Sequence, residues 1–86
     1  SRFLSLPDGG RIELMRREGV QSCPAGEHVG YAHLALSLGS VEAVEQKTAE
    51  LREKGAAVIS GPRWTGDGYF ESVVLDPDGN LLELTV

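Results

Sequence analysis

An eight-residue pattern that occurs twice constrains the fold of this chain more than any other feature. "PDGGRIEL" covers residues 7–14 and "PDGNLLEL" covers residues 77–84, and the two copies share five of their eight residues. Pro, Asp and Gly favour a tight turn, and alternating residues after such a turn are typical of a β-hairpin. The turn itself is common. The glutamate is more specific, because Glu13 and Glu83 each lie five positions after the aspartate of the turn, between apolar residues.

The second copy ends a longer pattern over residues 30–86 that predicts the order β-α-β-β-β. The segment "YAHLALSL" alternates strictly between apolar and other residues, which indicates a strand at 31–38. Its apolar face consists of Ala32, Leu34, Leu36 and Leu38, and its other face consists of Tyr31, His33, Ala35 and Ser37.

A helix is expected at about 41–54, because Ser40 can cap its start and Gly55 can end it. We expect the helix to cover the leucine face of the preceding strand with an inward stripe of Val41, Val44, Thr48 and Leu51. Further strands are predicted at 56–60, 69–75 and 81–86, with "GPRWTGDG" as a loop and "DPDGN" as a turn.

The first copy ends what should be an equivalent unit, yet only six residues precede Pro7. Strands are predicted at 2–6 and 10–16, so residues 1–16 correspond to the last hairpin of an incomplete first module. Residues 17–29 are polar and rich in Gly and Pro, which indicates a linker to the second module at 30–86. Either an N-terminal segment is missing, or the protein is a half-sized variant that pairs with another chain. We favour the missing segment.

The composition fits one small domain with a thin core and argues against several classes of protein. The chain has 86 residues, 41% of them hydrophobic, and lacks an apolar run long enough for a membrane helix. Its net charge is −5 and its basic residues are scattered, which argues against a nucleic-acid surface. A single cysteine, Cys23, excludes an internal disulfide and suits the reducing cytoplasm. Its position beside Pro24 in the linker indicates a structural or incidental role.

Three residues with metal-binding side chains share one expected orientation. By the alternation of strand residues, Glu13 and Glu83 face away from their apolar neighbours, and His33 faces away from its leucines. Two alternatives stay open: a lone histidine on a half-buried strand is often structural, and a glutamate on an edge strand is often only solvated. His28 lies in the linker and is expected to be exposed rather than a ligand.

Three further residues are candidates for contact with a substrate. Glu71 shares a strand face with Tyr69 and Val73, so it contacts substrate if that face lines a cleft and is a solvated rim residue otherwise. Arg63 and Trp64 lie in the predicted loop, where they could grip an anionic or planar ligand. An equal alternative is a surface arginine beside a locally packed tryptophan.

Four segments together resemble the glyoxalase/bleomycin-resistance/dioxygenase group, the vicinal oxygen chelate superfamily. They are "RIELM", "GYAHLALSL", "LREKGAAV" and "GDGYFESVVLDPDGNLLELTV", and they are most similar to short, glyoxalase-I-like members. The resemblance implies an α+β fold in which two βαβββ modules form a curved sheet around a cleft. It also implies that His33, Glu83 and Glu13 are metal ligands. The family's fourth ligand, from the first strand of the first module, has no counterpart here.

The residue types suit a divalent ion such as Zn, Ni, Mn or Fe, which could hold two adjacent substrate oxygens and act as a Lewis acid. Glu83 or Glu13 would then move a proton as general base and acid. The hypothesis is a glyoxalase-I-like lyase or isomerase for a small α-oxo or hydroxycarbonyl substrate. A binding protein that sequesters an antibiotic or metabolite is the main alternative. An extradiol dioxygenase ranks last, because it generally needs two histidines and a carboxylate. Exposed sheet edges predict a homodimer.

Overall fold

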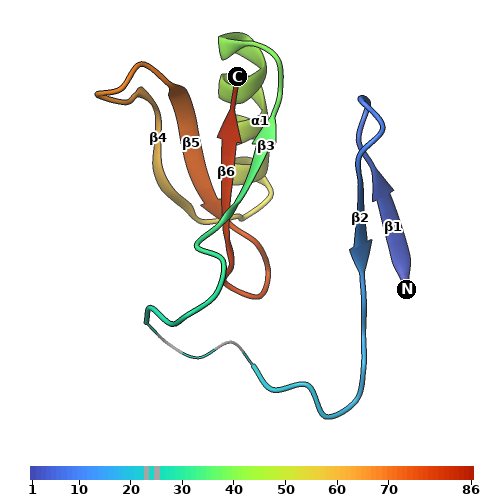
Figure 1. The fold of residues 1–86 in the computed structure, drawn as a ribbon. Helices are drawn as coiled ribbons and strands as arrows, with labels where there is room; N and C mark the ends of the chain where they lie inside the picture. The colour runs from blue at the N-terminus through green and yellow to red at the C-terminus, as the bar shows by residue number, and fades with distance from the viewer. Residues whose placement is uncertain (23, 25) are drawn as a thin grey trace.

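The computed structural model describes residues 1–86 except residues 23 and 25 (Figure 1). The chain forms a two-stranded hairpin followed by a β-α-β-β-β unit, so the predicted α+β class is confirmed. The hairpin consists of β1 (Arg2–Ser5) and β2 (Arg11–Leu14). The larger unit consists of β3 (Leu34–Ser37), α1 (Val41–Glu53), β4 (Val58–Trp64), β5 (Phe70–Leu75) and β6 (Leu81–Thr85). Among the described residues, no helix is long and apolar enough to cross a membrane.

The four strands of the larger unit form one mixed sheet in the order β3-β6-β5-β4. β3 pairs with β6 in parallel, and the other two pairs are antiparallel. The first strand of this unit therefore lies beside its last strand. A parallel pair of this kind needs a long crossover connection, and α1, β4 and β5 all lie between the two strands in the sequence.

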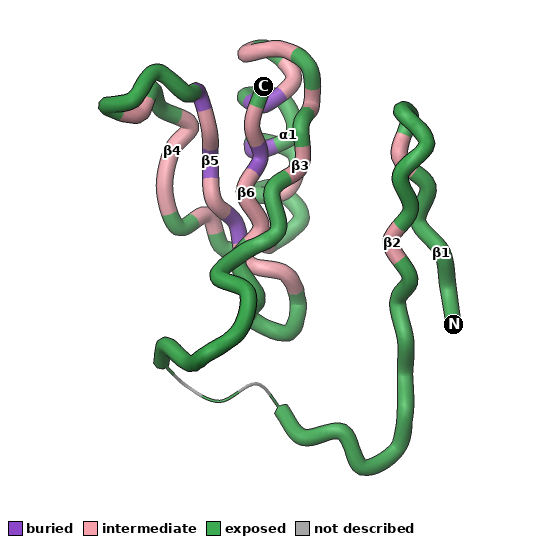
Figure 2. Tube along the Cα trace, in the orientation of Figure 1, coloured by how far each residue is buried: buried purple, intermediate pink, exposed green. Residues whose placement is uncertain are grey.

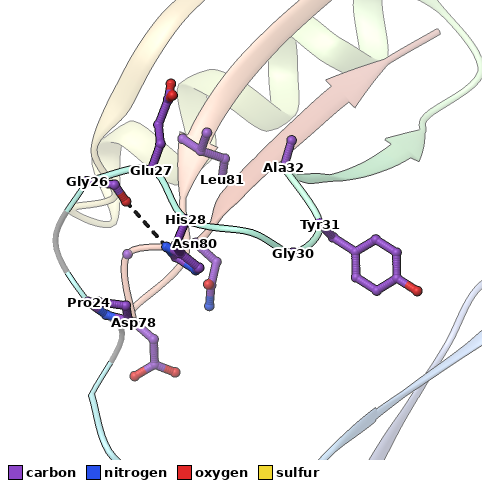
Figure 3. A pocket seen from close by; sticks show the side chains of 11 residues that line it. Pro24, Gly26, Glu27, His28, Gly30, Tyr31, Ala32, Asp78, Asn80 and Leu81 are labelled. Carbon is purple, nitrogen blue, oxygen red and sulfur yellow. Dashed lines mark hydrogen bonds between the residues drawn. The ribbon is translucent and has the colours of Figure 1, made fainter.

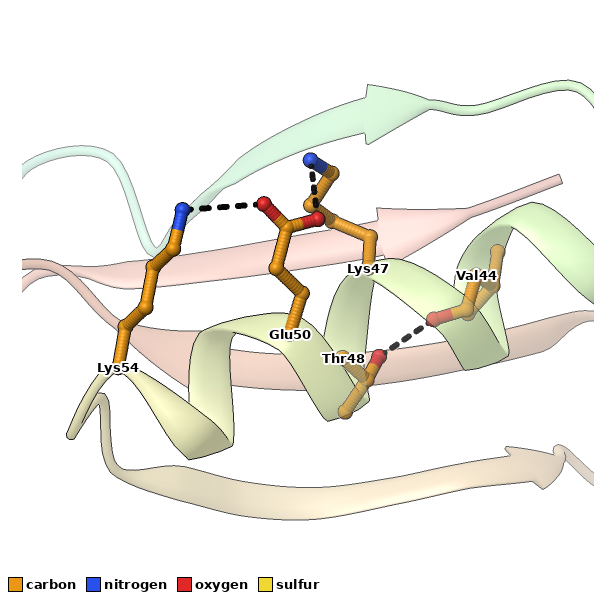
Figure 4. Close-up of polar contacts among 5 residues, drawn as sticks. All are labelled: Val44, Lys47, Thr48, Glu50 and Lys54. Atoms are coloured by element: carbon orange, nitrogen blue, oxygen red, sulfur yellow. Dashed lines mark hydrogen bonds and ion pairs between the residues drawn. The ribbon is translucent and has the colours of Figure 1, made fainter.

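Helix α1 begins where the sequence predicted. The side chain of Ser40 accepts a hydrogen bond of 3.1 Å from the backbone N–H of Ala43, which satisfies one free donor of the first turn. On the exposed side, Lys47 and Lys54 both pair with Glu50, at 2.9 Å and 3.1 Å (Figure 4). The helix lies on the side of the sheet to which Leu36 and Leu38 point, as expected, although its closest strands are β5, β4 and β6 rather than β3.

The hydrophobic core lies between α1 and the sheet (Figure 2). Its buried members are Val44, Phe70, Val74 and Leu84, and Leu36 and Leu38 of the leucine face pack against them at its border. Two buried polar residues join the layers: the hydroxyl oxygens of Thr48 on α1 and Ser72 on β5 are 2.7 Å apart. Thr48 also donates a hydrogen bond of 2.6 Å to the carbonyl of Val44.

Two strand predictions were wrong at their boundaries. β3 starts at Leu34 rather than at residue 31, so His33 lies just before the strand. β4 runs through the segment predicted as a loop and ends at Trp64, with irregular pairing between Val58 and Arg63. Gly61 makes this possible, because its φ is +75° and a Cβ there would lie 2.5 Å from the carbonyl oxygen of Glu71. The remaining predicted ends agree with the structure or differ from it by at most two residues.

The repeated pattern forms the same hairpin twice. In the first turn, the backbone N–H of Leu6 donates to the carbonyl of Gly10, and the N–H of Gly9 donates to the carbonyl of Leu6. In the second turn, the N–H of Asp76 donates to the carbonyl of Asn80, and the N–H of Gly79 donates to the carbonyl of Asp76. The strand registers also match after a shift of 70 positions, for example Phe3 opposite Glu13 and Val73 opposite Glu83. The two copies of the sequence pattern therefore have the same turn hydrogen bonds and the same strand pairing.

The first hairpin lies apart from the four-stranded sheet (Figure 1). Within the described part of the chain, β1 and β2 contact each other and no other strand or helix. The connection from residue 15 to residue 33 contains no strand or helix at its described positions, and its role as a linker between two modules stays a prediction. Cys23 lies outside the described residues.

Candidate functional site

The sheet has two faces, and only one is covered by α1. Along β5, Phe70, Ser72 and Val74 are buried beneath the helix, whereas the alternate residues Glu71, Val73 and Leu75 are only partly buried. We call the uncovered side the open face. The strand registers place the following residues on it: Ala35 and Ser37 from β3, Glu83 and Thr85 from β6, Glu71 and Val73 from β5, and Arg63 from β4.

His33 and Glu83 meet on the open face. Ala35 pairs with Glu83, so His33, two positions earlier, points to the same side as this glutamate. The Nε2 atom of His33 lies 2.8 Å from the Oε2 atom of Glu83, and their side chains are 43% and 18% exposed. The expected orientation of both side chains is therefore found in the structure, although His33 precedes the strand.

Glu71 joins this pair from the neighbouring strand. The pKa of Glu71 is raised, and the largest cause is that neutral Glu71 can donate a hydrogen bond to Glu83. Partial burial of Glu71 is the second cause, and repulsion by the negative charge of Glu83 is the third. Arg63, directly opposite Glu71 on β4, acts in the other direction and lowers the pKa, and Asp67 raises it slightly. Two neighbouring acidic groups and one arginine thus act on the pKa of Glu71 across this part of the face.

A shallow hollow of about 390 Å³ lies over these carboxyl groups. It is lined by Asp67, Tyr69, Glu71, Glu83, Thr85 and Val86. Sequence reasoning missed Asp67 and Thr85 as lining residues. Thr85 could have been found from the strand alternation, since it lies two positions after Glu83. Asp67 could not, because its place depends on the conformation of the β4–β5 loop.

The structure does not bring all predicted site residues together. Glu13 lies on β2, and its hairpin contacts no other strand or helix within the described part of the chain. Trp64 pairs with Phe70 on the helix side of the sheet, where the two rings lie 5.2 Å apart at 62°. It therefore does not share the open face with Arg63, and its indole packs against a core residue.

His28 lies at a different place. It lines a larger hollow of about 620 Å³ between the linker and the β5–β6 turn, together with Asp78 and Asn80 (Figure 3). Its Nδ1 atom is 3.4 Å from the carbonyl oxygen of Gly26. This position agrees with the expectation that His28 is an exposed linker residue.

The donor set on the open face fits part of a metal site. Two donor atoms bound to one ion at about 2.1 Å lie about 3.4 Å apart in tetrahedral geometry and about 3.0 Å apart at right angles, so an ion would have to separate the histidine nitrogen and the glutamate oxygen slightly. The observed spacing is 2.8 Å, between His33 and Glu83. At the described positions, however, no three His, Cys, Asp or Glu side chains are grouped so that they could hold a metal ion. His33 and Glu83 can thus supply two ligands, and a third must come from elsewhere.

Of the three known structures compared below, the first has the same fold over the part of the chain that it matches. A hypothetical protein from S. aureus matches 66% of this chain with a TM-score of 0.60 and 24% identity, and this chain spans 50% of its length. An integron cassette protein from V. cholerae is similar over 98% of this chain and 73% of its own length, with 21% identity and a TM-score of 0.47. A virulence protein from Salmonella typhimurium matches 96% of the chain and 74% of its own length, with 16% identity and a TM-score of 0.48.

No curated protein gives a significant match to this chain. A family model, in contrast, matches almost all of it. The model describes the Glyoxalase/Bleomycin resistance protein/Dioxygenase superfamily, and the match runs over residues 2–84. This range includes both copies of the repeated hairpin and the three central residues of the open face, His33, Glu71 and Glu83. The chain therefore belongs to the glyoxalase/bleomycin resistance protein/dioxygenase superfamily.

Proposed function

We propose that the open face binds a small molecule and that the protein is a metal-dependent lyase or isomerase of the glyoxalase I type. The contact between His33 and Glu83 carries this proposal, since it brings an imidazole nitrogen and a carboxylate oxygen, both common metal ligands, together at one place on the open face. A bound Zn, Ni, Mn or Fe ion would supply Lewis acidity for two neighbouring substrate oxygens.

The side chains around this pair have separate proposed roles. Glu83 takes a proton from the substrate carbon and returns it to the adjacent carbon, as general base and acid. Glu71 contacts the substrate from β5, where its position beside Glu83 supports this role. Arg63, across the strand pair from Glu71, binds an anionic group of the substrate. Glu13 remains the proposed third ligand and an alternative base.

A binding protein without catalysis is the second candidate. The superfamily includes both enzymes and non-catalytic binding proteins. The observation that favours this candidate is that the described side chains provide no group of three metal ligands. In this case the same hollow would hold an antibiotic or metabolite, and His33 would donate a hydrogen bond to Glu83 without binding metal.

Isothermal titration with Ni²⁺ or Zn²⁺ separates the two candidates. For the metal-dependent enzyme we expect near-stoichiometric binding that is lost in His33→Ala and in Glu83→Gln. His28→Ala is the matched control, because this histidine lies in the linker at a separate hollow, and it should bind metal like the wild type. Metal-free protein whose titrations show no difference among these variants would end the enzyme proposal. An assay with methylglyoxal and glutathione then tests the substrate.

The proposal also includes location and assembly. The single cysteine, Cys23, favours a reducing compartment such as the cytoplasm. The small-molecule substrate is the main proposed partner, together with a second copy of the chain in a homodimer. Neither a nucleic acid nor a membrane is part of the proposal.

A further inference from the structure

A further hollow lies on the side of the sheet that α1 covers. It has a volume of about 390 Å³ and is lined by Glu45, Thr48, Ala49, Arg52, Pro62 and Phe70. The first four of these residues belong to α1, and the last two belong to β4 and β5. Phe70 alternates with Glu71 along β5, so this hollow and the open face lie on opposite sides of the same strands. A ligand bound here would be separate from the candidate site.

The middle of the hollow is apolar. Ala49 is exposed on the helix and carries only a methyl group, which leaves the helix surface low at this point. Across from the helix, the pairing of β4 with β5 is irregular between Ser60 and Arg63, the stretch that contains Pro62. The ring of Phe70 is 7% exposed and forms the apolar end of this wall. An apolar group can therefore lie between Ala49 and the two strand residues.

Two opposite charges flank this apolar floor. Glu45 and Arg52 lie seven positions apart on α1, close to two helix turns, so both are on the same side of the helix as Ala49 between them. The helix rises about 10.5 Å over this interval, which is farther than the three or four positions over which side chains usually pair. Within the described part of the chain, the ion pairs of α1 all involve Glu50, and neither Glu45 nor Arg52 takes part in one.

This arrangement is complementary to a zwitterion. The carboxylate of Glu45 can pair with an ammonium group, and the guanidinium of Arg52 can bind a carboxylate through two parallel hydrogen bonds. An apolar chain that joins the two groups would lie over Ala49 and against Phe70, which removes apolar surface from water. A ligand with only one charge would lose one of the two polar contacts.

We propose that this hollow is a second binding site, for a small zwitterion whose ammonium and carboxylate groups are joined by an apolar chain. The ammonium group contacts Glu45, the carboxylate group contacts Arg52, and the chain lies against Ala49, Pro62 and Phe70. The site goes beyond the proposed function, since it uses neither a metal ion nor a side chain of the open face.

NMR titration of the isotope-labelled, metal-free 86-residue chain with 6-aminohexanoate tests the site. We expect saturable shift changes at the backbone amides of Ala49, Arg52 and Phe70, with low affinity, because each exposed charge pair contributes little. Hexanoate and 1-aminohexane have the same apolar chain with one charge each, and each should bind about threefold or more weakly. A wild type without saturable changes at these amides, or equal binding of the zwitterion and either one-charge probe, would overturn the proposal.

Variants of α1 test the two charges separately. Glu45→Gln and Arg52→Gln should each weaken the binding of 6-aminohexanoate about threefold or more. Glu53→Gln is the matched control, because it removes the same charge from the same helix at a residue that does not line the hollow, and it should bind like the wild type. Equal weakening by Glu45→Gln and Glu53→Gln would show a general charge effect and contradict the site.

A larger side chain at Ala49 tests the hollow itself. Ala49→Leu should abolish the shift changes, because leucine fills the floor of the hollow, and leucine is well tolerated at an exposed helix position. Wild-type affinity in this variant would contradict the site. Because the metal titration concerns the other side of the sheet, either experiment can fail without the other.

Discussion

Glu71 and Glu83 are diagonal neighbours on the open face of the sheet. Glu71 pairs with Thr85 and Glu83 pairs with Val73, so the two carboxyl groups lie on adjacent strands, two positions apart in register. Glu83 raises the pKa of Glu71 from its ordinary value of 4.5, first through a hydrogen bond and then, with partial burial, through charge repulsion. Glu83 also touches His33, so this one residue links both of its neighbours in the candidate site.

The pKa of Glu71 should respond in opposite directions to changes on its two sides. We expect Glu83→Gln to lower it toward 4.5, because the main cause of the shift is removed. Arg63→Gln should raise it further, since the favourable charge opposite Glu71 is lost. NMR titration of the Glu71 side chain in metal-free protein measures both changes. Asp67→Asn is the matched control, and it should change the pKa of Glu71 less than Glu83→Gln does. A larger change with Asp67→Asn would contradict the order of these causes.

The same shift makes a prediction for stability. Because the pKa of Glu71 is raised on folding, its contribution to stability is fully present below about pH 4.5 and is lost as the pH rises through the raised pKa. Glu71→Gln has no such titration, so it should increase the melting temperature at neutral pH by roughly a few degrees. Thermal melts of both proteins between about pH 4 and pH 7 check this. A parallel pH dependence in the two proteins would contradict it.

Thr48 should matter more for stability than its partner Ser72. The hydroxyl of Thr48 donates to the carbonyl of Val44, so the hydroxyl of Ser72 is left to donate to Thr48. Thr48→Val therefore leaves a buried hydroxyl on Ser72 without a partner, at a cost of about 1–3 kcal/mol. Ser72→Ala should cost less, because Thr48 keeps its bond to Val44. Urea denaturation measures both, and a larger cost for Ser72→Ala would contradict this assignment of donors.

Gly61 should not tolerate a side chain. Its φ of +75° is unfavourable for other residues, and an added Cβ would lie 2.5 Å from the carbonyl oxygen of Glu71. Gly61→Ala is expected to lower the free energy of unfolding by about 2 kcal/mol or more. Gly66→Ala is the matched control in the next loop, where a Cβ would meet nothing within 4 Å. Equal stability of the two variants would show that β4 can move away from β5 at low cost.

Much of the fold could be predicted because local patterns and tertiary packing agree. Local sequence patterns specify these elements. The alternation around Leu36 specifies β3, the cap at Ser40 specifies the start of α1, and the turns before Ile12 and Leu82 specify the two hairpins. The extent of β4 could not be predicted in this way. Its pairing with β5 continues through Gly61 and Pro62, residues that normally end a strand, because the irregular register places them where the ladder is interrupted.

The candidate site was predictable to the extent that it follows from strand alternation. The orientation of His33 and Glu83 was expected from their positions in the sequence, whereas the face of Glu71 was left open. The registers of β3, β5 and β6 bring the three residues to one face. Glu13 follows the same rule within its own hairpin, but alternation says nothing about where that hairpin lies. Trp64 packs locally, which is the alternative left open for it, and its side of the sheet could not be predicted because it depends on the register shift in β4.

The parallel pairing of β3 with β6 has a consequence for how the protein is made. His33 and Glu83 meet only across this pair, and all of α1, β4 and β5 separates them along the chain. The helix and the β4–β5 pair can form from neighbouring segments as they leave the ribosome. The open face is assembled last, when residues 81–85 have emerged and can insert between β3 and β5. Until then a nascent chain can hold most of its secondary structure without the contact between His33 and Glu83.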